Sequence, residues 1–434
     1  MPECYDAISD SPAGARGGLL KAFLIPRWAK MPKTKPKTRM ALSMWIVAVE
    51  LAIVFAGSTL PTPLYLLYRR SFGFSEITLT LIYAVYVLGN LSALFLFGRL
   101  SDQIGRKTTT VPALIIALIS TIAFAFAVST SWLFIARLLS GFATGLAAGT
   151  ATAWITELQP RGDKTAATIL AAAANLAGLS LGPLIGGMLA AYGPRPLLLP
   201  YLVYIAMLIL VAISLCFSTE TVEKHVHALK EISLRPRLGV PREIRSKFIS
   251  PAVTAFGIFS LIGFYSALIP GLLAKDLHRS SPAVSGAVVV ELFAIGAIAV
   301  ALGRTVRSRT AMLTGLVILL PSLGLLIMAQ TTSSFPLLLA GTAFGGISSG
   351  FGYRGSLEVV NEISPDEKRS EVVSSYLIVC YLGNSIPVIG VGLLSQLAGP
   401  LTAHVSFAGV VCVFALVGVV TGVKYRPDES SAHS

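Results

Sequence analysis

The chain has 434 residues, of which 54% are hydrophobic and only 13% are charged, and its mean hydropathy is +0.76. So few charged residues cannot cover a water-soluble protein of this length, and the composition therefore places the chain in a lipid bilayer. Its net charge of +13 would suit a nucleic-acid-binding protein, but we expect the basic residues to mark one membrane face instead.

The first 42 residues form a basic tail that has no apolar periodicity. RWAKMPKTKPKTR (27–39) is typical of this segment. We expect the tail to be disordered and drawn to anionic lipid. Met31 and Met40 are candidate translation starts besides Met1, and a start at either would leave part of the tail out of the protein.

Twelve apolar stretches follow the tail, each long enough to cross about 30 Å of hydrocarbon as a helix. They are 43–66, 77–100, 108–128, 131–157, 166–191, 196–217, 250–274, 283–303, 310–329, 334–358, 370–396 and 401–423. An even number places both termini on one side, and the excess of Lys and Arg there predicts that this side is cytoplasmic. The long polar loop 218–249 then separates two six-helix bundles, 43–217 and 250–423, and 424–434 is a cytoplasmic tail.

Two segments of the chain resemble each other at corresponding places in these bundles. ELQPRGDK (157–164) aligns with EISPDEKR (362–369), and each follows an apolar run with a GxxxG step. Repeated halves related by an axis along the membrane normal are a known transporter architecture. The alternative is a chance match between two segments of biased composition.

The loop between the second and third spans is GRLSDQIGRK (98–107). Its pattern, GxxxDxxGRK, resembles the signature loop of the major facilitator superfamily of secondary transporters, although Gln103 stands where that family usually has a basic residue. The resemblance implies a gating role for Gly98, Asp102, Gly105, Arg106 and Lys107, together with Glu157 at the end of the fourth span. The alternative is simple anchoring at the membrane surface.

The fourth span contains Arg137 in RLLSGFATG, which is similar to a family pattern of an arginine followed by glycines four and eight residues later. A lone arginine in a membrane helix costs several kcal/mol unless it faces a polar cavity or partner, so we expect Arg137 to be functional. The rise of a helix places it about 10 Å from Glu50 along the membrane normal, nearer Ser58 and Thr59.

The fifth span reads GLSLGPLIGG (178–187). It resembles the GxxxGPxxGG motif of major facilitator exporters that exchange protons for drugs, and its motif residues are Gly178, Gly182, Pro183, Gly186 and Gly187. Such spacing bends a helix and permits close contact with a neighbour, for which we expect the eighth span. Ordinary helix packing is the alternative explanation.

Two acidic residues lie deep in predicted spans, Glu50 in the first and Glu291 in the eighth. Each must be protonated, paired or exposed to an aqueous cavity. These are also the demands on a carboxyl group that couples transport to protons, whereas the alternative is a static polar pair.

Aromatic and amide side chains inside the spans suit a cavity for an amphipathic organic substrate. The candidates are Pro61, Tyr86, Asn90, Asn175, Tyr265, Tyr381 and Asn384, with Tyr65, Tyr83 and Tyr376 of the same kind. About half of them can equally be ordinary interface or core residues.

Together these features predict an all-α membrane protein of twelve helices with the major facilitator fold. We expect a monomeric, proton-coupled exporter of small organic molecules in a bacterial-type inner membrane; the alternative is proton-coupled uptake of a sugar, organic acid or siderophore-like metabolite. We expect no enzymatic activity, cofactor, metal or nucleic-acid partner, because the histidines lie outside the span centres and no GxxxxGK[ST] phosphate loop is present.

Overall fold

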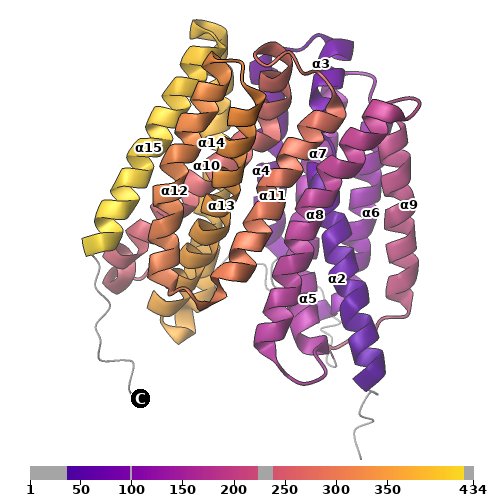
Figure 1. The fold of residues 1–434 in the computed structure, drawn as a ribbon. Coiled ribbons are helices and arrows are strands. Elements are labelled where there is room, and N and C mark those ends of the chain that lie inside the picture. The colour runs from indigo at the N-terminus through magenta and orange to yellow at the C-terminus, as the bar shows by residue number, and fades with distance from the viewer. Residues whose placement is uncertain (1–36, 98–99, 223–237, 425–434) are drawn as a thin grey trace, which may run out of the picture.

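The computed structural model describes residues 37–97, 100–222 and 238–424. These residues are overwhelmingly helical, with no β-strand among them, and twelve helices or helix pairs are long and apolar enough to cross a membrane. The predicted fold class, an all-α membrane protein with twelve spans, is therefore confirmed (Figure 1). Gly98, most of the basic tail and residues 425–434 lie outside the described residues.

The first six spans form the N-terminal half of the molecule. Its helices are α2 (Lys37–Thr59), η2 (Thr62–Leu64), α3 (Tyr65–Phe72), α4 (Glu76–Phe97), α5 (Leu100–Ile104), α6 (Arg106–Ala125), α7 (Thr130–Leu158), α8 (Lys164–Tyr192) and α9 (Leu199–Cys216). The first span begins at Lys37, six residues inside the tail expected from the sequence. It is broken after Thr59 because Pro61 and Pro63 remove backbone donors.

The last six spans form the C-terminal half. Its helices are η4 (Arg242–Ile244), α10 (Arg245–Lys275), α11 (Pro282–Leu302), η5 (Gly303–Thr305), α12 (Ser308–Thr331), α13 (Phe335–Ile363), η6 (Asp366–Lys368), α14 (Arg369–Ala398) and α15 (Pro400–Lys424). Helix α10 starts five residues before 250, the expected start of the second bundle.

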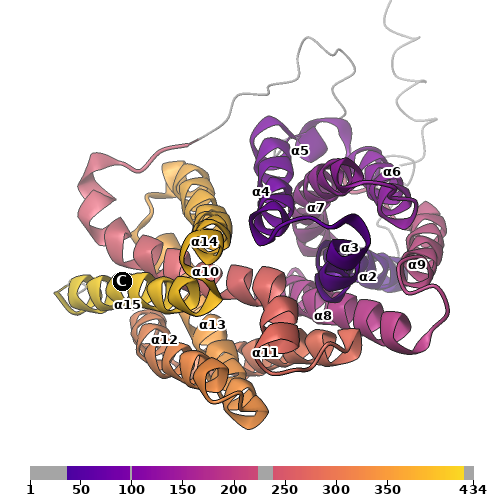
Figure 2. The same ribbon diagram turned by 90° about the horizontal axis from the view of Figure 1, so that it is seen from above.

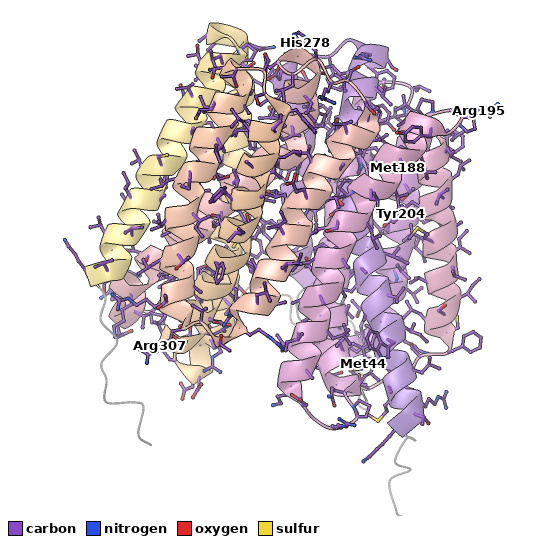
Figure 3. The ribbon with its side chains drawn as sticks, in the orientation of Figure 1. Met44, Met188, Arg195, Tyr204, His278 and Arg307 are labelled. Atoms are coloured by element: carbon purple, nitrogen blue, oxygen red, sulfur yellow. The ribbon has the colours of Figure 1, made fainter. Side chains whose placement is uncertain are left out.

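The two halves lie side by side and meet along two pairs of helices, α8 with α11 and α4 with α14 (Figure 2). Lys37 and Lys424 lie at the same end of the bundle, which we call the terminal end. In Figure 3, Met44 and Arg307 lie toward the terminal end, and Arg195 and His278 lie at the opposite end. Helices α8 and α11 come together toward the opposite end and diverge toward the terminal end (Figure 1).

Glycines in α8 determine how closely this helix packs on its neighbours. A Cβ atom at Gly178, Gly182 or Gly186 would overlap backbone carbonyl oxygens of α2, the first span. Gly187 instead lies against Pro282 of α11, while Pro183 contacts Gly286 of the same helix. The sequence predicts the eighth span, α11, as the partner of the motif. In the structure the motif has two partners, and most of the motif's glycines lie against α2 rather than α11.

Candidate functional site

A polar and aromatic cluster lies where α4 of the N-terminal half meets α14 of the C-terminal half. The Tyr83 hydroxyl donates a hydrogen bond across the interface to Asn384 Oδ1 at 3.1 Å. One helical turn further, Asn90 Nδ2 donates to the Tyr86 hydroxyl at 3.3 Å, and Tyr381 of α14 also interacts with Asn90. The structure thus brings four of the predicted cavity residues together.

Arg137 of α7 packs against this cluster and is only 2% exposed. Its guanidinium lies over the rings of Tyr86, at 4.6 Å, and Tyr83, at 5.3 Å, and Nη1 donates to the Ser58 carbonyl oxygen at 2.6 Å. The helical rise therefore placed Arg137 at the correct depth. No carboxylate pairs with it in the described part of the chain, so aromatic faces and one carbonyl carry the stabilisation of a buried cation.

Glu50 of α2 has no exposed surface, and neither carboxyl oxygen has a hydrogen-bond partner among residues 37–97, 100–222 and 238–424. It lies on the side of α2 that faces α9, because Tyr204 of α9 donates to the Ile53 carbonyl oxygen and packs on Gly57. The sequence left three possible states for Glu50: protonated, paired, or exposed to an aqueous cavity. Its burial without any partner among the described residues excludes the paired and the exposed state in this conformation. A charged carboxylate without partners is too costly there, so Glu50 is neutral in this conformation.

Glu291 of α11 lies in the other half and is partly exposed, although its Oε2 atom is buried and has no partner in the described ranges. It interacts electrostatically with Tyr265 of α10, whose own hydroxyl receives a hydrogen bond from Thr342 of α13 at 3.1 Å. The two membrane acids thus belong to separate halves. Tyr265 accompanies Glu291 and lies apart from the Tyr83–Asn384 cluster.

The remaining two cavity candidates lie on the first and fifth spans. Asn175 is half-buried on α8, and Pro61 is buried in the break between α2 and η2. Beside this break, Thr59 donates to the Leu179 carbonyl oxygen of α8 at 3.1 Å. Pro61 therefore helps to shape the α2–α8 contact in this conformation.

Arg106 organises the loop between the second and third spans. It pairs with Asp102 Oδ1 at 2.6 Å and with Glu157 Oε1 at 2.5 Å, and it also donates to the Ser101 hydroxyl at 2.6 Å. Gly105 precedes it with φ +107°, a backbone conformation that side chains rarely adopt. The residues expected to form a charged latch are therefore in contact, and all of them belong to the N-terminal half.

Glu220, which the sequence analysis did not single out, completes this arrangement. Its carboxylate accepts the backbone N–H groups of Arg106 at 3.0 Å and Lys107 at 2.8 Å, at the start of α6. Burial acts to raise the pKa of Glu220, but these and two further backbone donors outweigh it and hold the pKa below its ordinary value. The start of α6 was the one signal in the sequence that could have indicated such a contact. Gly105 has no side chain to cap the helix, so the first backbone N–H groups of α6 need an acceptor from elsewhere in the chain.

The C-terminal half has an equivalent loop arrangement without the acid of the first loop. Arg354 of α13 donates to the carbonyl oxygens of Gly303, Arg304 and Val306, and pairs with Glu358 at 2.8 Å. Glu362, which aligns with Glu157 in the internal repeat, accepts from the Ser308 hydroxyl at the start of α12 at 2.7 Å. The repeat therefore extends to the polar contacts that hold each loop.

A cluster of ionic groups joins the halves at the opposite end. Lys275 Nζ of α10 lies 2.6 Å from Glu76 Oε2 of α4, and Arg69 Nη1 of α3 lies 3.5 Å from the same oxygen. This contact could not be predicted from the sequence, because nothing in the local pattern relates residues 199 positions apart. The ion pair of Lys275 with Glu76 therefore links the two halves at this end.

The part of the chain that the structure describes contains no group of three or more His, Cys, Asp or Glu side chains placed to hold a metal ion. The membrane-spanning helices instead offer acidic side chains with buried oxygens, the buried guanidinium of Arg137, and hydroxyl and amide groups. Such groups bind, orient and exchange protons.

Comparison with known proteins gives concordant results. A family model described as "Major Facilitator Superfamily" matches residues 47–308 and 252–434. The chain is 24% identical over 400 residues to the multidrug efflux protein YfmO of Bacillus subtilis (strain 168), covering 90% of this chain and 96% of YfmO. It is 26% identical over 156 residues to the quinolone resistance protein NorA of Staphylococcus aureus, covering 36% of this chain and 40% of NorA.

The fold resembles crystal structures of a bacterial homolog of the human lysosomal transporter Spinster. The TM-score is 0.73 at 18% identity for the inward-facing, occupied conformation and 0.70 at 17% for the unoccupied one. Both alignments cover 91% of this chain and 100% of the other.

Proposed function

This chain belongs to the Major Facilitator Superfamily, and from that premise we propose that it exports small organic molecules in exchange for protons. Transport would proceed by alternating access, in which the two halves expose a central site first to one membrane face and then to the other. A transport role rather than an enzymatic one follows from the family and from its transporter relatives.

The observation that carries proton coupling is the placement of Glu50 and Glu291. Each is an acid inside a membrane-spanning helix, and buried carboxyl oxygens of both lack partners among the described residues. Intramembrane acids are costly and mark proton or substrate paths. Because each half holds one such acid, movement of the halves can change the surroundings of both and so drive the uptake and release of protons.

The basic residues support an orientation with the terminal end in the cytoplasm of a bacterial-type inner membrane. In that orientation the Lys275–Glu76 pair joins the halves at the outer face, and α8 and α11 diverge toward the cytoplasmic face, where an exporter collects its substrate (Figure 1). One chain supplies both halves and the site between them, which supports a monomeric transporter.

The chemistry of the central cluster supports an amphipathic organic substrate. Tyr83, Tyr86 and Tyr381 offer aromatic faces, and Asn90 and Asn384 offer amides that can donate and accept hydrogen bonds. The Tyr83–Asn384 hydrogen bond spans the halves. A substrate that replaced this hydrogen bond would therefore act directly on one of the contacts between the two halves.

The printed names of two relatives, a multidrug efflux protein and a quinolone resistance protein, favour export of drug-like molecules. The glycine-rich motif in α8 supports the same choice. Uptake of a metabolite together with protons remains the second candidate, because the scaffold and both acids would serve it equally well.

The direction of proton flow separates these two candidates. Energised inside-out membrane vesicles, whose lumen is acidic, receive a quinolone on the outside while a pH-sensitive dye reports the lumen. An exporter takes up the quinolone and releases protons, so the lumen becomes more alkaline. A symporter would carry protons in with its substrate and acidify the lumen.

A susceptibility and accumulation screen of cells with and without the protein identifies the substrate. We expect Glu50→Gln and Glu291→Gln to abolish the difference in accumulation. Glu367→Gln, at an exposed acid of η6, is the matched control and should retain it. Unaltered accumulation in both membrane variants would refute the coupling role.

A further inference from the structure

A polar cavity lies between the two halves at the opposite end of the bundle. Its volume is about 20 Å³, measured as the space open to the centre of a water molecule, which exceeds the minimum of about 10–15 Å³ that one water needs. Helices α3 and α4 line one side, and α10 and α15 line the other. The charged and polar side chains of the lining are Arg69, Glu76, Lys275, Asp276 and His404. Because Lys275 is 42% exposed, the lining reaches bulk water.

Hydrogen bonds outside the cavity determine which ring nitrogen of His404 carries the proton. Gln330 Nε2 of α12 donates to Asp276 Oδ2 at 3.0 Å, because a carboxylate can only accept. The other end of this amide, Oε1, therefore lies 2.8 Å from His404 Nδ1 and accepts from it. The neutral ring then has its proton on Nδ1, and Nε2 offers a lone pair that needs a donor.

The Nε2 atom of His404 is on the side of the ring that faces the cavity. His404 is 3% exposed, and Nε2 is buried without a partner among the residues that the structure describes. The Nδ1 side of the ring meets Gln330, and Phe264 packs against the ring in a T-shaped arrangement with centroids 5.0 Å apart. His404 lines the cavity, whereas Gln330 and Phe264 do not. The edge of the ring at the cavity is therefore the one that carries Nε2.

The charges around the cavity favour a neutral ligand that can donate hydrogen bonds. Arg69 and Lys275 supply two positive charges, and Glu76 and Asp276 supply two negative charges, so neither a cation nor an anion is preferred. A water molecule can donate one proton to His404 Nε2 and the other to the Glu76 carboxylate, and it can accept from the Lys275 ammonium group. Three polar partners are typical of a buried water.

We propose that this cavity holds a water molecule that donates to His404 Nε2 and joins α15 to Glu76 of α4. This water is a second link between the halves beside the Lys275–Glu76 ion pair, and it makes His404 a gating residue of the opposite end. The inference goes beyond the proposed function, because it is the same for any substrate and for either direction of proton flow.

Solid-state nuclear magnetic resonance tests the water directly, on full-length protein in lipid vesicles with its five histidines labelled with nitrogen-15. The His404 signals are those lost in both His404→Phe and His404→Gln. We expect Nδ1 to carry the proton and Nε2 to receive magnetisation from water protons. Leu79→Phe fills the cavity and should reduce this transfer severalfold. Leu401→Phe, the same exchange at an exposed position of α15, should leave it unchanged.

The distance between the halves reports what the water does. It is measured by pulsed electron paramagnetic resonance between spin labels at Tyr192 of α8 and Leu397 of α14, both highly exposed. His404→Phe keeps an aromatic ring beside Phe264 but removes Nε2, so the long-distance population should rise roughly twofold or more. Gln330→Leu removes the amide outside the cavity and keeps Nε2, so this population should stay native.

Four results would each overturn the proposal. They are a proton on Nε2 in the native protein, no transfer from water to Nε2, a native long-distance population in folded His404→Phe, and a population in Gln330→Leu as high as in His404→Phe. The last result would place the effect in the contact with Gln330 rather than in the water. The vesicle transport assay judges the proposed function separately, since both spectroscopic measurements are made without substrate.

Discussion

Replacing Lys275 by methionine should weaken closure of the opposite end of the bundle. Lys275 and Glu76 form an ion pair at 2.6 Å between α10 and α4, and therefore between the two halves. Methionine keeps an unbranched apolar stem but removes the charge. Arg69, 3.5 Å from the same carboxylate and on the same half, remains, so the change removes this ion pair between the halves without leaving Glu76 unpaired.

The size of the effect follows from the exposure of the two side chains. Lys275 is 42% exposed, so solvent screens the pair, whereas Glu76 is only 12% exposed. Exposed pairs contribute about 0.2–1 kcal/mol, and the burial of Glu76 places this pair near the upper limit, at about 1 kcal/mol. That difference changes the ratio of closed to open molecules about fivefold.

Pulsed electron paramagnetic resonance measures this ratio directly. Spin labels at Tyr192 of α8 and Leu397 of α14, both highly exposed and near the opposite end, are attached in a protein whose four native cysteines are replaced. The long-distance population should rise in Lys275→Met and stay native in Lys275→Arg. The difference should shrink in 1 M salt. Identical distance distributions for Lys275→Met and Lys275→Arg at low salt would show that the pair does not hold the halves together.

Three further predictions concern stability. The pKa of Glu220 is lowered in the folded protein from its ordinary value of 4.5, so Glu220 should stabilise the fold fully above pH 4.5 and lose this effect as the pH falls through the lowered pKa. The difference in thermal midpoint between the native protein and Glu220→Gln should therefore disappear at acidic pH. A difference that grows at acidic pH would refute this prediction. Arg354→Met should cost about 1–2 kcal/mol, because it removes the side-chain donors from the carbonyl oxygens of Gly303, Arg304 and Val306. This cost is measured as a lower thermal midpoint, which Lys424→Met should not change. Gly182→Val should prevent stable folding, because the valine side chain would overlap Ala56 and Thr59. Gly409→Val should purify normally, since no atom lies within 4 Å of the added Cβ. Equal yields of the two purified variants would contradict the close packing of α8 on α2.

Local patterns and helix geometry were sufficient for the twelve spans and for much of the first loop. Asp102 and Arg106 are four residues apart on the chain, so their pairing required no knowledge of distant packing, whereas Glu157 was placed beside them only by the family resemblance. Likewise, a rise of about 1.5 Å per residue placed Arg137 beside Ser58. These predictions depend only on spacing along helices whose ends are fixed by the membrane.

Which neighbour a helix face meets could not be predicted from the sequence. Helix α2 is apolar on all sides, so periodicity gave the depth of Glu50 but not its direction toward α9. A run of glycines indicates close packing but does not determine which helix is the neighbour. In α8, most of the motif packs on α2. The contacts of Lys275 with Glu76 and of Glu220 with the start of α6 join distant parts of the chain and become visible only in three dimensions.

The most direct test of the proposed function uses purified protein in liposomes with an imposed pH gradient and no other energy source. Protons flow out of the liposomes down the imposed gradient while the substrate moves in. We expect a quinolone, or the substrate found by the accumulation screen, to become severalfold more concentrated inside than outside. In Glu50→Gln and Glu291→Gln, we expect the inside and outside concentrations to become equal and to rise no further. Uphill accumulation that persists in both variants, or accumulation that ignores the gradient, would contradict proton-coupled export.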